Sequence, residues 1–416
     1  MLGGGPLQVP AIDALKRAGH YVICADYDEN APGFELSDEY AVISTLDQEA
    51  IYGIAANKSV DYIITSTSDA PVRVAAYVSE RLGLPTGISY QNAIAATQKD
   101  VMRERLDSSG IAIPGYKICC TLAEFETALE FYQFNCVVKP ADSAASRGVM
   151  LVEGTLSNVQ ISALYEATLE VSKKGIVMVE ERMEGFEVSV EALTINKQTV
   201  VVAITDKLIT PPPYFVELGH SEPSALSSAD QASVANLACQ AIEAIGIVSG
   251  PSHTEIMITK DGPKVVEIAA RLGGDYITSK LVPLSTGVDI VALSVALAVG
   301  DTIDIPDCVT TAASIGFLTS SAGIIAEIQI DDSLYSLPGF YELELYKKPG
   351  EAASIPHSSN DRIGHIICIG GTRRDVDESM RRAKEKIKVI LVSSNPLRYQ
   401  QSAESGTASQ RAWYPG

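Results

Sequence analysis

The stretch from Gly250 to Asp275, GPSHTEIMITKDGPKVVEIAARLGGD, decides how this sequence is interpreted. Two β-type runs, EIMIT and KVVEIAA, flank the tight turn KDG at 260–262, and this pattern predicts an antiparallel hairpin. Side chains alternate between the two faces of a strand, so neighbouring strands can present Glu255 and Glu267 on one face. The stretch therefore predicts a pair of carboxylates held side by side.

A guanidinium follows the second carboxylate, because Arg271 lies four residues after Glu267 and precedes a Gly-Gly pair. Carboxylates bind hard cations such as Mg²⁺, and an arginine fork offsets charge on phosphate oxygens. The alternative is a surface hairpin with unrelated acids. That alternative is disfavoured, because an acid inside a run such as KVVEIAA needs a partner when it is buried.

The composition limits the classes of partner. The chain has 416 residues, 46% of them hydrophobic, which is enough for several domains with cores of their own. It has 32 lysines and arginines against 52 acids, a net charge of −20. Nonspecific binding to nucleic acid or to an anionic membrane is therefore not expected. A polyanionic substrate would need a local cationic pocket or a metal.

Cysteine usage and hydropathy indicate a cytoplasmic protein. None of the seven cysteines forms a CxxC motif, and most lie in apolar runs, which is typical of buried, reduced thiols. No signal peptide opens the chain, and the most apolar run, Val288–Val299, contains Asp289 and is too short for a bilayer. We interpret that run as a packed helix.

Residues 1 to about 95 alternate strand and helix, with a helix at 11–18 and strands at 1–2, 21–25 and 62–65, which predicts a doubly wound parallel sheet. The glycine turn GGGP at 3–6 is not GxGxxG, so it is a weak dinucleotide signal. A nicotinamide oxidoreductase would need that fingerprint, although Asp26 is present.

The rest of the chain predicts further α/β structure. Helices are expected at 99–110, 122–131, 228–245 and 375–387, and strands at 136–139, 149–152, 176–180 and 186–192. Strand-rich runs follow residue 300, and the segment 393–416 is expected to be a flexible tail. The fold class is therefore α/β with more than one domain.

Four motifs in this order resemble the ATP-grasp superfamily: VVKPADSAASRGV, VEERMEGFEVSVEA, FVELGHSEPS and the opening stretch. The likeness covers roughly residues 1–390 and is strongest to carboxylate–amine ligases of the L-amino acid ligase and carbamoyl-phosphate-synthetase-like branch. It implies a Rossmann-like domain at 1–95 and an ATP-grasp domain at 96–300, with a small lid at about 112–180. A biotin-carboxylase-like α+β domain would follow at 301–392.

The resemblance also implies roles for individual residues. Lys99 and Lys139 match the lysines that contact ATP phosphates, and Glu187 matches the acid that binds ribose. The loop 142–148 matches the flap over the phosphates, and Glu180–Met183 match the hinge that binds adenine. The implied ATP-binding set is Lys99, Lys139, Ser143, Ser146, Arg147, Gly148, Glu180, Glu181, Met183 and Glu187.

Glu255 and Glu267 match the Mg²⁺ ligands, and Arg271 matches the arginine that stabilises an acyl-phosphate. Many relatives carry Asn two residues after the second metal ligand, where this chain has Ala269. His220, expected in a polar loop between a strand and a helix, is the second catalytic candidate, and a surface role for it is the alternative.

For His253 we favour a supporting role beside the metal ligands over a catalytic one.

The function that the resemblance implies is ATP-dependent ligation of a carboxylate to an amine through an acyl-phosphate, with Mg²⁺ (or Mn²⁺). Two alternatives stay open: a bicarbonate- or formate-activating enzyme, and an ATP-binding protein without catalysis. The expected partners are small-molecule carboxylates and amines, with neither nucleic acid nor membrane. A homodimer is the expected assembly.

Overall fold

The computed structural model describes residues 1–143, 147–211 and 215–392. The N-terminal part is a small parallel sheet, as predicted. β1 (Ile23–Asp26) pairs in parallel with β2 (Glu39–Val42), and Leu2 forms parallel bridges to Ala25 and Thr65. The strands expected at 1–2 and 62–65 are thus reduced to single bridges.

Helices cover both faces of this sheet, which makes it doubly wound. On one face Ile12 packs with Cys24. On the other face Val74 and Val78 pack with Leu2. The helices are α1 (Val9–Arg17), α2 (Gly33–Leu36), α3 (Gln48–Lys58) and α4 (Ala70–Leu82).

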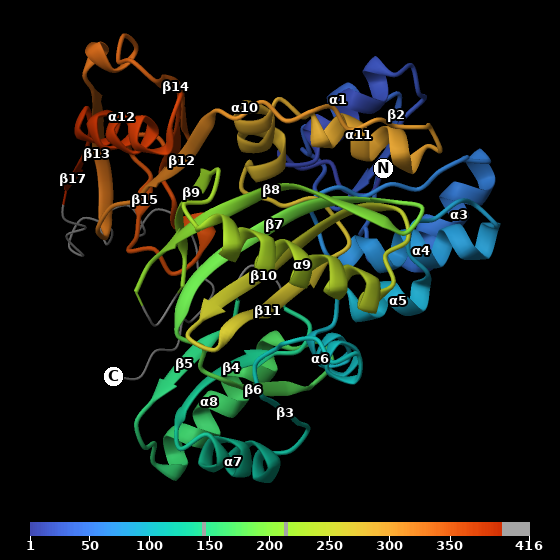
Figure 1. The fold of residues 1–416 in the computed structure, drawn as a ribbon, viewed down its shortest axis with the longest axis vertical. Helices are drawn as coiled ribbons and strands as arrows, with labels where there is room; N and C mark the ends of the chain where they lie inside the picture. Colours follow the sequence, from blue (N-terminus) through green and yellow to red (C-terminus); the bar gives the residue numbers. More distant parts are fainter. Residues whose placement is uncertain (144–146, 212–214, 393–416) are drawn as a thin grey trace, which may run out of the picture.

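A four-stranded antiparallel sheet follows and is called the lid below; in Figure 1 it lies at the bottom, with α7 and α8 beneath it. Cys136 and Val138 pack against the two helices, whereas Val137 and Lys139 point to the opposite face. Alternate side chains of this strand thus face the core of the lid, and the side chains between them face the opposite side of the sheet. The lid contains β3 (Tyr116–Cys119), α7 (Leu122–Phe131), β4 (Asn135–Pro140), β5 (Met150–Glu153), α8 (Asn158–Val171) and β6 (Val177–Glu181).

Local signals explain where the helices begin. Thr121 and Glu124 form a capping box at the start of α7, as Ser157 and Gln160 do for α8. The N-terminal part joins the lid through α5 (Tyr90–Ala95) and α6 (Lys99–Ser108).

The largest sheet has eight strands in the order β11-β10-β7-β8-β9-β12-β16-β14. Strands from before and after residue 300 therefore share one sheet, and α9 (Ser228–Ile245) crosses one of its faces (Figure 1). The strands are β7 (Gly185–Ile195), β8 (Gln198–Ile209), β9 (Glu217–Glu222), β10 (Gly250–Thr259), β11 (Gly262–Ala269), β12 (Ala312–Leu318), β14 (Phe340–Leu345) and β16 (Gly364–Gly370).

The remaining elements surround this sheet. They are a π-helix (Ile277–Leu281), α10 (Val282–Thr286), α11 (Ile290–Ala298), β13 (Gly323–Ile330), a 3₁₀ turn (Asp332–Leu334), β15 (Ala352–Ala353), a second 3₁₀ turn (Ser359–Asp361), α12 (Arg373–Glu385) and β17 (Ile387–Val392).

Across the described residues, no single helix has the length and apolar character to cross a membrane. Only the bent pair Ile277–Thr286 and Ile290–Ala298 passes that test together, by length and composition alone. The segment 393–416, expected to be a flexible tail, lies outside the described residues. All seven cysteines are described, and all are free thiols.

Candidate active site

A cleft of about 1320 Å³ lies between the lid, the largest sheet and the N-terminal part. Most of the residues singled out from the sequence line it, although they come from seven separate helices and strands and three loops. These are Lys99, Lys139, Ser143, Arg147, Glu180, Glu181, Met183, Glu187, His220, Glu255, Glu267 and Arg271. Gly148 follows Arg147 at a positive φ of 75° and packs against Pro140, and Ser146 lies outside the described residues.

The two acids of the opening hairpin are directly opposite each other, as predicted, because β10 and β11 pair Glu255 with Glu267. Each acid is bound to a lysine in this structure. Lys207 donates to Glu255 at 2.7 Å, and Lys99 donates to Glu267 at 2.7 Å. Burial alone would raise the pKa of Glu255, but Lys207 and His253 hold it well below its ordinary value. Two opposed, ionised carboxylates are a donor set that suits Mg²⁺.

Sequence reasoning missed Lys207. Its side chain is 5% exposed and its ammonium group contacts Glu187 and Glu255, with Glu217 at 3.9 Å. Burial would lower the pKa of Lys207, yet these three carboxylates raise it well above its usual value. The sequence did contain a signal for Lys207, because a lysine inside the β-type run VVAITDKLI is as unusual as a glutamate inside the strands of the hairpin.

A second buried group of charges lies at the back of the lid. Glu180 accepts hydrogen bonds from Arg103 through both oxygens, Oε1 from Nε at 2.8 Å and Oε2 from Nη2 at 3.1 Å, and Lys139 lies 2.7 Å from Oε2. Burial would raise the pKa of Glu180, but Arg103 and Lys139 lower it to about 2. Burial lowers the pKa of Lys139 to about 8. Glu180 opposes this shift, but the positive charges of Arg103 and Lys99 nearby add to it.

Glu180 therefore differs from the hinge residue that was expected. Its carboxylate anchors Lys139 and Arg103, and its backbone pairs within the lid sheet with Tyr116 and Val137. The chain leaves that sheet only after Glu181, so the connection to β7 is formed by 182–184. Met183 in this connection lines the cleft.

Arg271 is held by a residue from the N-terminal part. Its Nε donates to Asp69 at 2.6 Å, and its Nη1 donates to the carbonyl of Leu272 at 2.9 Å. Asp69 lies 202 positions away in the sequence, at the start of α4, so no local pattern pointed to it. The salt bridge fixes the guanidinium at the cleft wall.

His220 lies in β9 and is 3% exposed, so the expectation of a polar loop was wrong. The segment pairs with both β8 and β12, which places the imidazole between strands. Its Nε2 is 3.4 Å from Asp275 Oδ2, and its Nδ1 has no hydrogen-bond partner among the described residues. Asp275 accepts two hydrogen bonds from Arg362, at 2.9 and 2.7 Å.

The end of the cleft formed by His220, Asp275 and Arg362 carries both positive and negative charges. Arg362 stacks on Phe317 at 3.6 Å and also donates to the carbonyl of Glu217 at 3.0 Å. Burial would raise the pKa of Asp275, but His220 and Arg362 hold it well below its usual range. Sequence reasoning missed Asp275 and Glu217.

His253 takes the supporting position expected of it. Its Nδ1 contacts the buried Glu191 at 2.5 Å and its Nε2 lies 3.5 Å from Glu255. Burial would lower the pKa of His253, but Glu191 raises it to about 9. The imidazole lies opposite Ala269 in the hairpin register.

Comparisons with known proteins agree with this geometry. A family model described as "ATP-grasp domain" matches residues 132–279, and one described as "L-amino acid ligase C-terminal domain 2" matches residues 316–392. Alanine--anticapsin ligase of Bacillus subtilis (strain 168) is 29% identical over 265 residues, which is 59% of this chain and 55% of that protein.

Formate-dependent phosphoribosylglycinamide formyltransferase of Shewanella frigidimarina is 30% identical over 198 residues, 47% of this chain and 49% of that protein. The chain thus spans about half the length of these two curated relatives. The crystal structure of L-amino acid ligase from Bacillus licheniformis superposes with a TM-score of 0.79 at 20% identity and covers 94% of this chain and 98% of that one.

The acid pair on the hairpin and Lys207, which donates to it, lie within the residues matched to the ATP-grasp model. This chain therefore carries an ATP-grasp domain, followed by a C-terminal domain of the L-amino acid ligase type.

Proposed function

We propose that this chain joins the carboxylate of an amino acid to an amine, with ATP as the energy source. The observation that carries the proposal is the charge pattern of the cleft. Glu255, Glu267 and the lysines beside them suit a metal–nucleotide, while the far end offers Glu217 and Asp275 beside Arg362. An amino acid carries both an ammonium and a carboxylate, so it matches a wall with charges of both signs.

The reaction has two steps. A carboxylate oxygen of the first substrate bonds to the γ-phosphorus of ATP while the bond from that phosphorus to the β–γ bridging oxygen breaks, which gives an acyl-phosphate and ADP. The nitrogen of the amine then bonds to the acyl carbon, inorganic phosphate leaves, and the nitrogen loses a proton. We assign that proton to His220, whose side chain lines the cleft wall.

The chain's own residues bind and orient the groups. Glu255 and Glu267 would hold Mg²⁺, which supplies positive charge next to the phosphate oxygens. Lys99 and Lys139 offset further phosphate charge, and Arg271, fixed by Asp69, stabilises charge on the acyl-phosphate. Lys99 also donates to the carbonyl of Ser143 at 2.7 Å, so the flap begins in contact with the phosphate-binding lysine.

One feature of the N-terminal wall argues against a phosphoribosyl substrate. Among the described residues of this wall that line the cleft, from Pro6 to Pro71, there is no lysine, arginine or histidine, and Asp69 is the one acid. A phosphate monoester placed there would find no cation among the residues of the wall itself. The wall thus favours an amino acid ligase over a formate- or bicarbonate-activating enzyme that acts on phosphoribosyl compounds.

The test is a phosphate-release assay with purified protein, Mg²⁺-ATP and each of the twenty amino acids, alone and in pairs. Parallel reactions contain formate or bicarbonate with phosphoribosyl amines. We expect ADP and phosphate in equal amounts with one or a few amino acids, and a product with the mass of the two substrates less water. Turnover restricted to the formate or bicarbonate reactions would refute the proposal, and so would ATP binding without turnover in every mixture.

We propose that the protein forms a homodimer. A measurement of its molecular mass in solution tests this assembly.

A further inference from the structure

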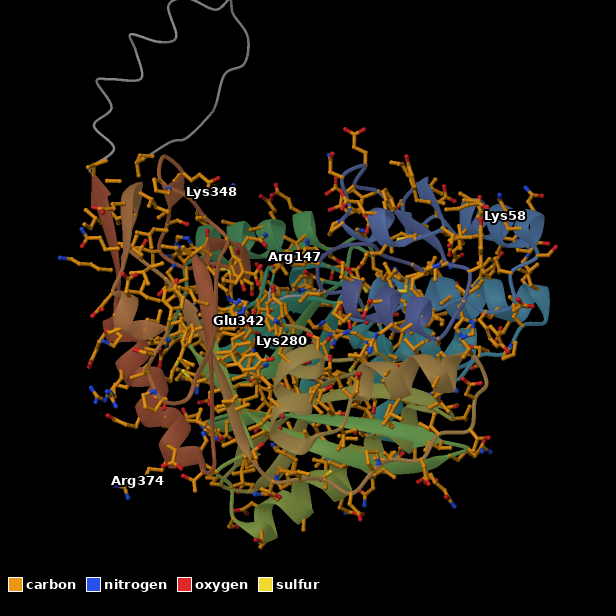
Figure 2. The ribbon with its side chains drawn as sticks, turned by 90° about the horizontal axis from the view of Figure 1, so that it is seen from above. Lys58, Arg147, Lys280, Glu342, Lys348 and Arg374 are labelled. Carbon is orange, nitrogen blue, oxygen red and sulfur yellow. The ribbon has the colours of Figure 1, made fainter. Side chains whose placement is uncertain are left out.

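A histidine and two glutamates converge where the C-terminal strands meet the cleft. Glu342 and Glu344 are on the same face of β14, and His365 faces them from the neighbouring β16. One ligand atom from each of the three side chains lies within 4.8 Å of the other two. Figure 2 shows Glu342 next to Lys280 in the middle of the molecule.

The imidazole of His365 supplies an observation independent of the acids. His365 is fully buried, and its Nε2 has no hydrogen-bond partner among the described residues. That nitrogen lies 3.4 Å from Oε1 of Glu342. Buried polar atoms are normally paired, so an unpaired nitrogen aimed at a carboxylate oxygen calls for a third group between them.

The surrounding contacts determine which ring nitrogen of His365 carries no proton. Nδ1 of His365 is 2.6 Å from the hydroxyl of Tyr346. Tyr346 in turn interacts with Tyr276, whose hydroxyl donates to Oε2 of Glu344 at 3.5 Å. If the Tyr346 proton points to Tyr276, then Nδ1–H of His365 donates to Tyr346 and Nε2 keeps its lone pair. A metal-bound histidine usually has this arrangement, with the second N–H held by an oxygen acceptor.

Glu342 is arranged to complement that lone pair, whereas Oε2 of Glu344 lies 3.9 Å from Nδ1 on the other side of the ring. Lys280 contacts Oε2 of Glu342, which leaves Oε1 facing His365. Hydrogen bonds to the second oxygen are typical of carboxylates that bind metals. A separation of 3.4 Å between a nitrogen and an oxygen suits two ligands of one ion at about 2.0–2.1 Å from each.

We propose that Glu342, Glu344 and His365 bind a divalent transition-metal ion such as Zn²⁺ or Mn²⁺. One imidazole with two carboxylates favours such ions over Mg²⁺ or Ca²⁺, which prefer oxygen ligands alone. Glu344, Tyr346 and Tyr276 line the cleft, so the ion would lie on its C-terminal wall. Three protein ligands leave a position for water or for a substrate oxygen.

This site is separate from the acid pair that would hold the Mg²⁺ of the nucleotide. β10 and β16 are five strands apart in the largest sheet, which corresponds to about 24 Å along the sheet. The inference does not depend on the ligase reaction, so its failure and that of the proposed function are distinguishable.

The test uses the full-length protein, stripped with a chelator and kept free of nucleotide. Co²⁺ is titrated while its visible d–d absorption is recorded, and Zn²⁺ binding is followed by calorimetry. We expect one equivalent bound in the wild type, binding weakened at least ~10-fold in Glu344→Gln and by ~10-fold in Tyr346→Phe, and binding lost in His365→Asn. Glu267→Gln is the matched control at the other acid pair and retains the binding.

Glu344 is half-exposed, so its amide variant folds even where the buried His365→Asn variant does not, and thermal melting of each variant shows which are folded. Equal Co²⁺ binding in wild type and folded Glu344→Gln would overturn the proposal. Binding lost in Glu267→Gln, or no bound Co²⁺ in the wild type, would overturn it as well.

Discussion

Replacement of Lys207 by methionine tests the charge balance on which the candidate site depends. Lys207 is 5% exposed and is shared by Glu187 and Glu255, whose side chains are 15% and 23% exposed. Methionine has a similar length and is apolar, so the packing of the stem is largely kept. The variant leaves two carboxylates close together without their cation.

The magnitude follows from the burial. Removal of one partner of a buried ion pair costs about 3–5 kcal/mol. The two acids keep some contact with solvent, so we take the lower end, about 3 kcal/mol. An unfolding entropy near 2.1 cal/mol/K per residue gives about 0.9 kcal/mol/K for this chain, so the melting temperature should fall by about 3–4 °C.

The assay is thermal unfolding with and without Mg²⁺. In the wild type Mg²⁺ must compete with Lys207 for Glu255, whereas in Lys207→Met that competing ammonium group is gone. Because a ligand stabilises the state that binds it, Mg²⁺ should raise the melting temperature of the variant more than that of the wild type.

Lys58→Met is the matched control, because its ion pair with Glu39 is on the surface, with side chains 47% and 37% exposed. Exposed pairs contribute about 0–1 kcal/mol, so this variant should melt within about 1 °C of the wild type. If Lys207→Met melts as the wild type does, or if Mg²⁺ stabilises both proteins equally, the reasoning about this cluster is wrong.

Three further predictions concern catalysis, pH and the lid. Glu267→Gln and Arg271→Ala should each abolish carboxylate-dependent ADP release while circular dichroism stays unchanged, and full activity in both would contradict the assignment. Because the pKa of Lys139 is lowered to about 8, its positive charge is lost as the pH rises through 8, so kcat/KM for ATP should fall there. Lys139→Arg should remove that decline, since arginine stays protonated, and an identical pH profile would refute the role. Phe125→Ala should destabilise the lid core by about 3–5 kcal/mol, measured by chemical denaturation, because Phe125 is fully buried there; a loss below 1 kcal/mol would show that the lid core does not depend on it.

Local pattern was sufficient for the hairpin at 250–275. The turn KDG and the alternation along both runs predicted the hairpin, but a register shift between Glu255 and Ile256 places Glu255 directly opposite Glu267, and that irregularity was not visible in the sequence. The capped helices α7 and α9 could be bounded from local sequence, since their signals lie within a few residues of their ends.

The lengths of the strands expected at 1–2 and 62–65 could not be predicted from local sequence. A parallel strand exists only as far as its neighbour extends, and the neighbour is distant in sequence. The placement of His220 failed for a related reason: the polar residues of FVELGHSEPS resemble a loop, but two flanking strands pair with this segment and bury it.

The sequence by itself determined the class of the fold and predicted acids, lysines and an arginine for a nucleotide site, because each lies in a short motif with its own pattern. The tertiary structure alone decided their partners: Asp69 for Arg271, Lys99 for Glu267 and Asp275 for Arg362 lie 202, 168 and 87 positions apart. Alternation along a strand fixes which way a side chain points, but the charge that meets it comes from whichever remote element packs on that face. Burial and ionisation in the cleft follow from that packing, so they became visible only in three dimensions.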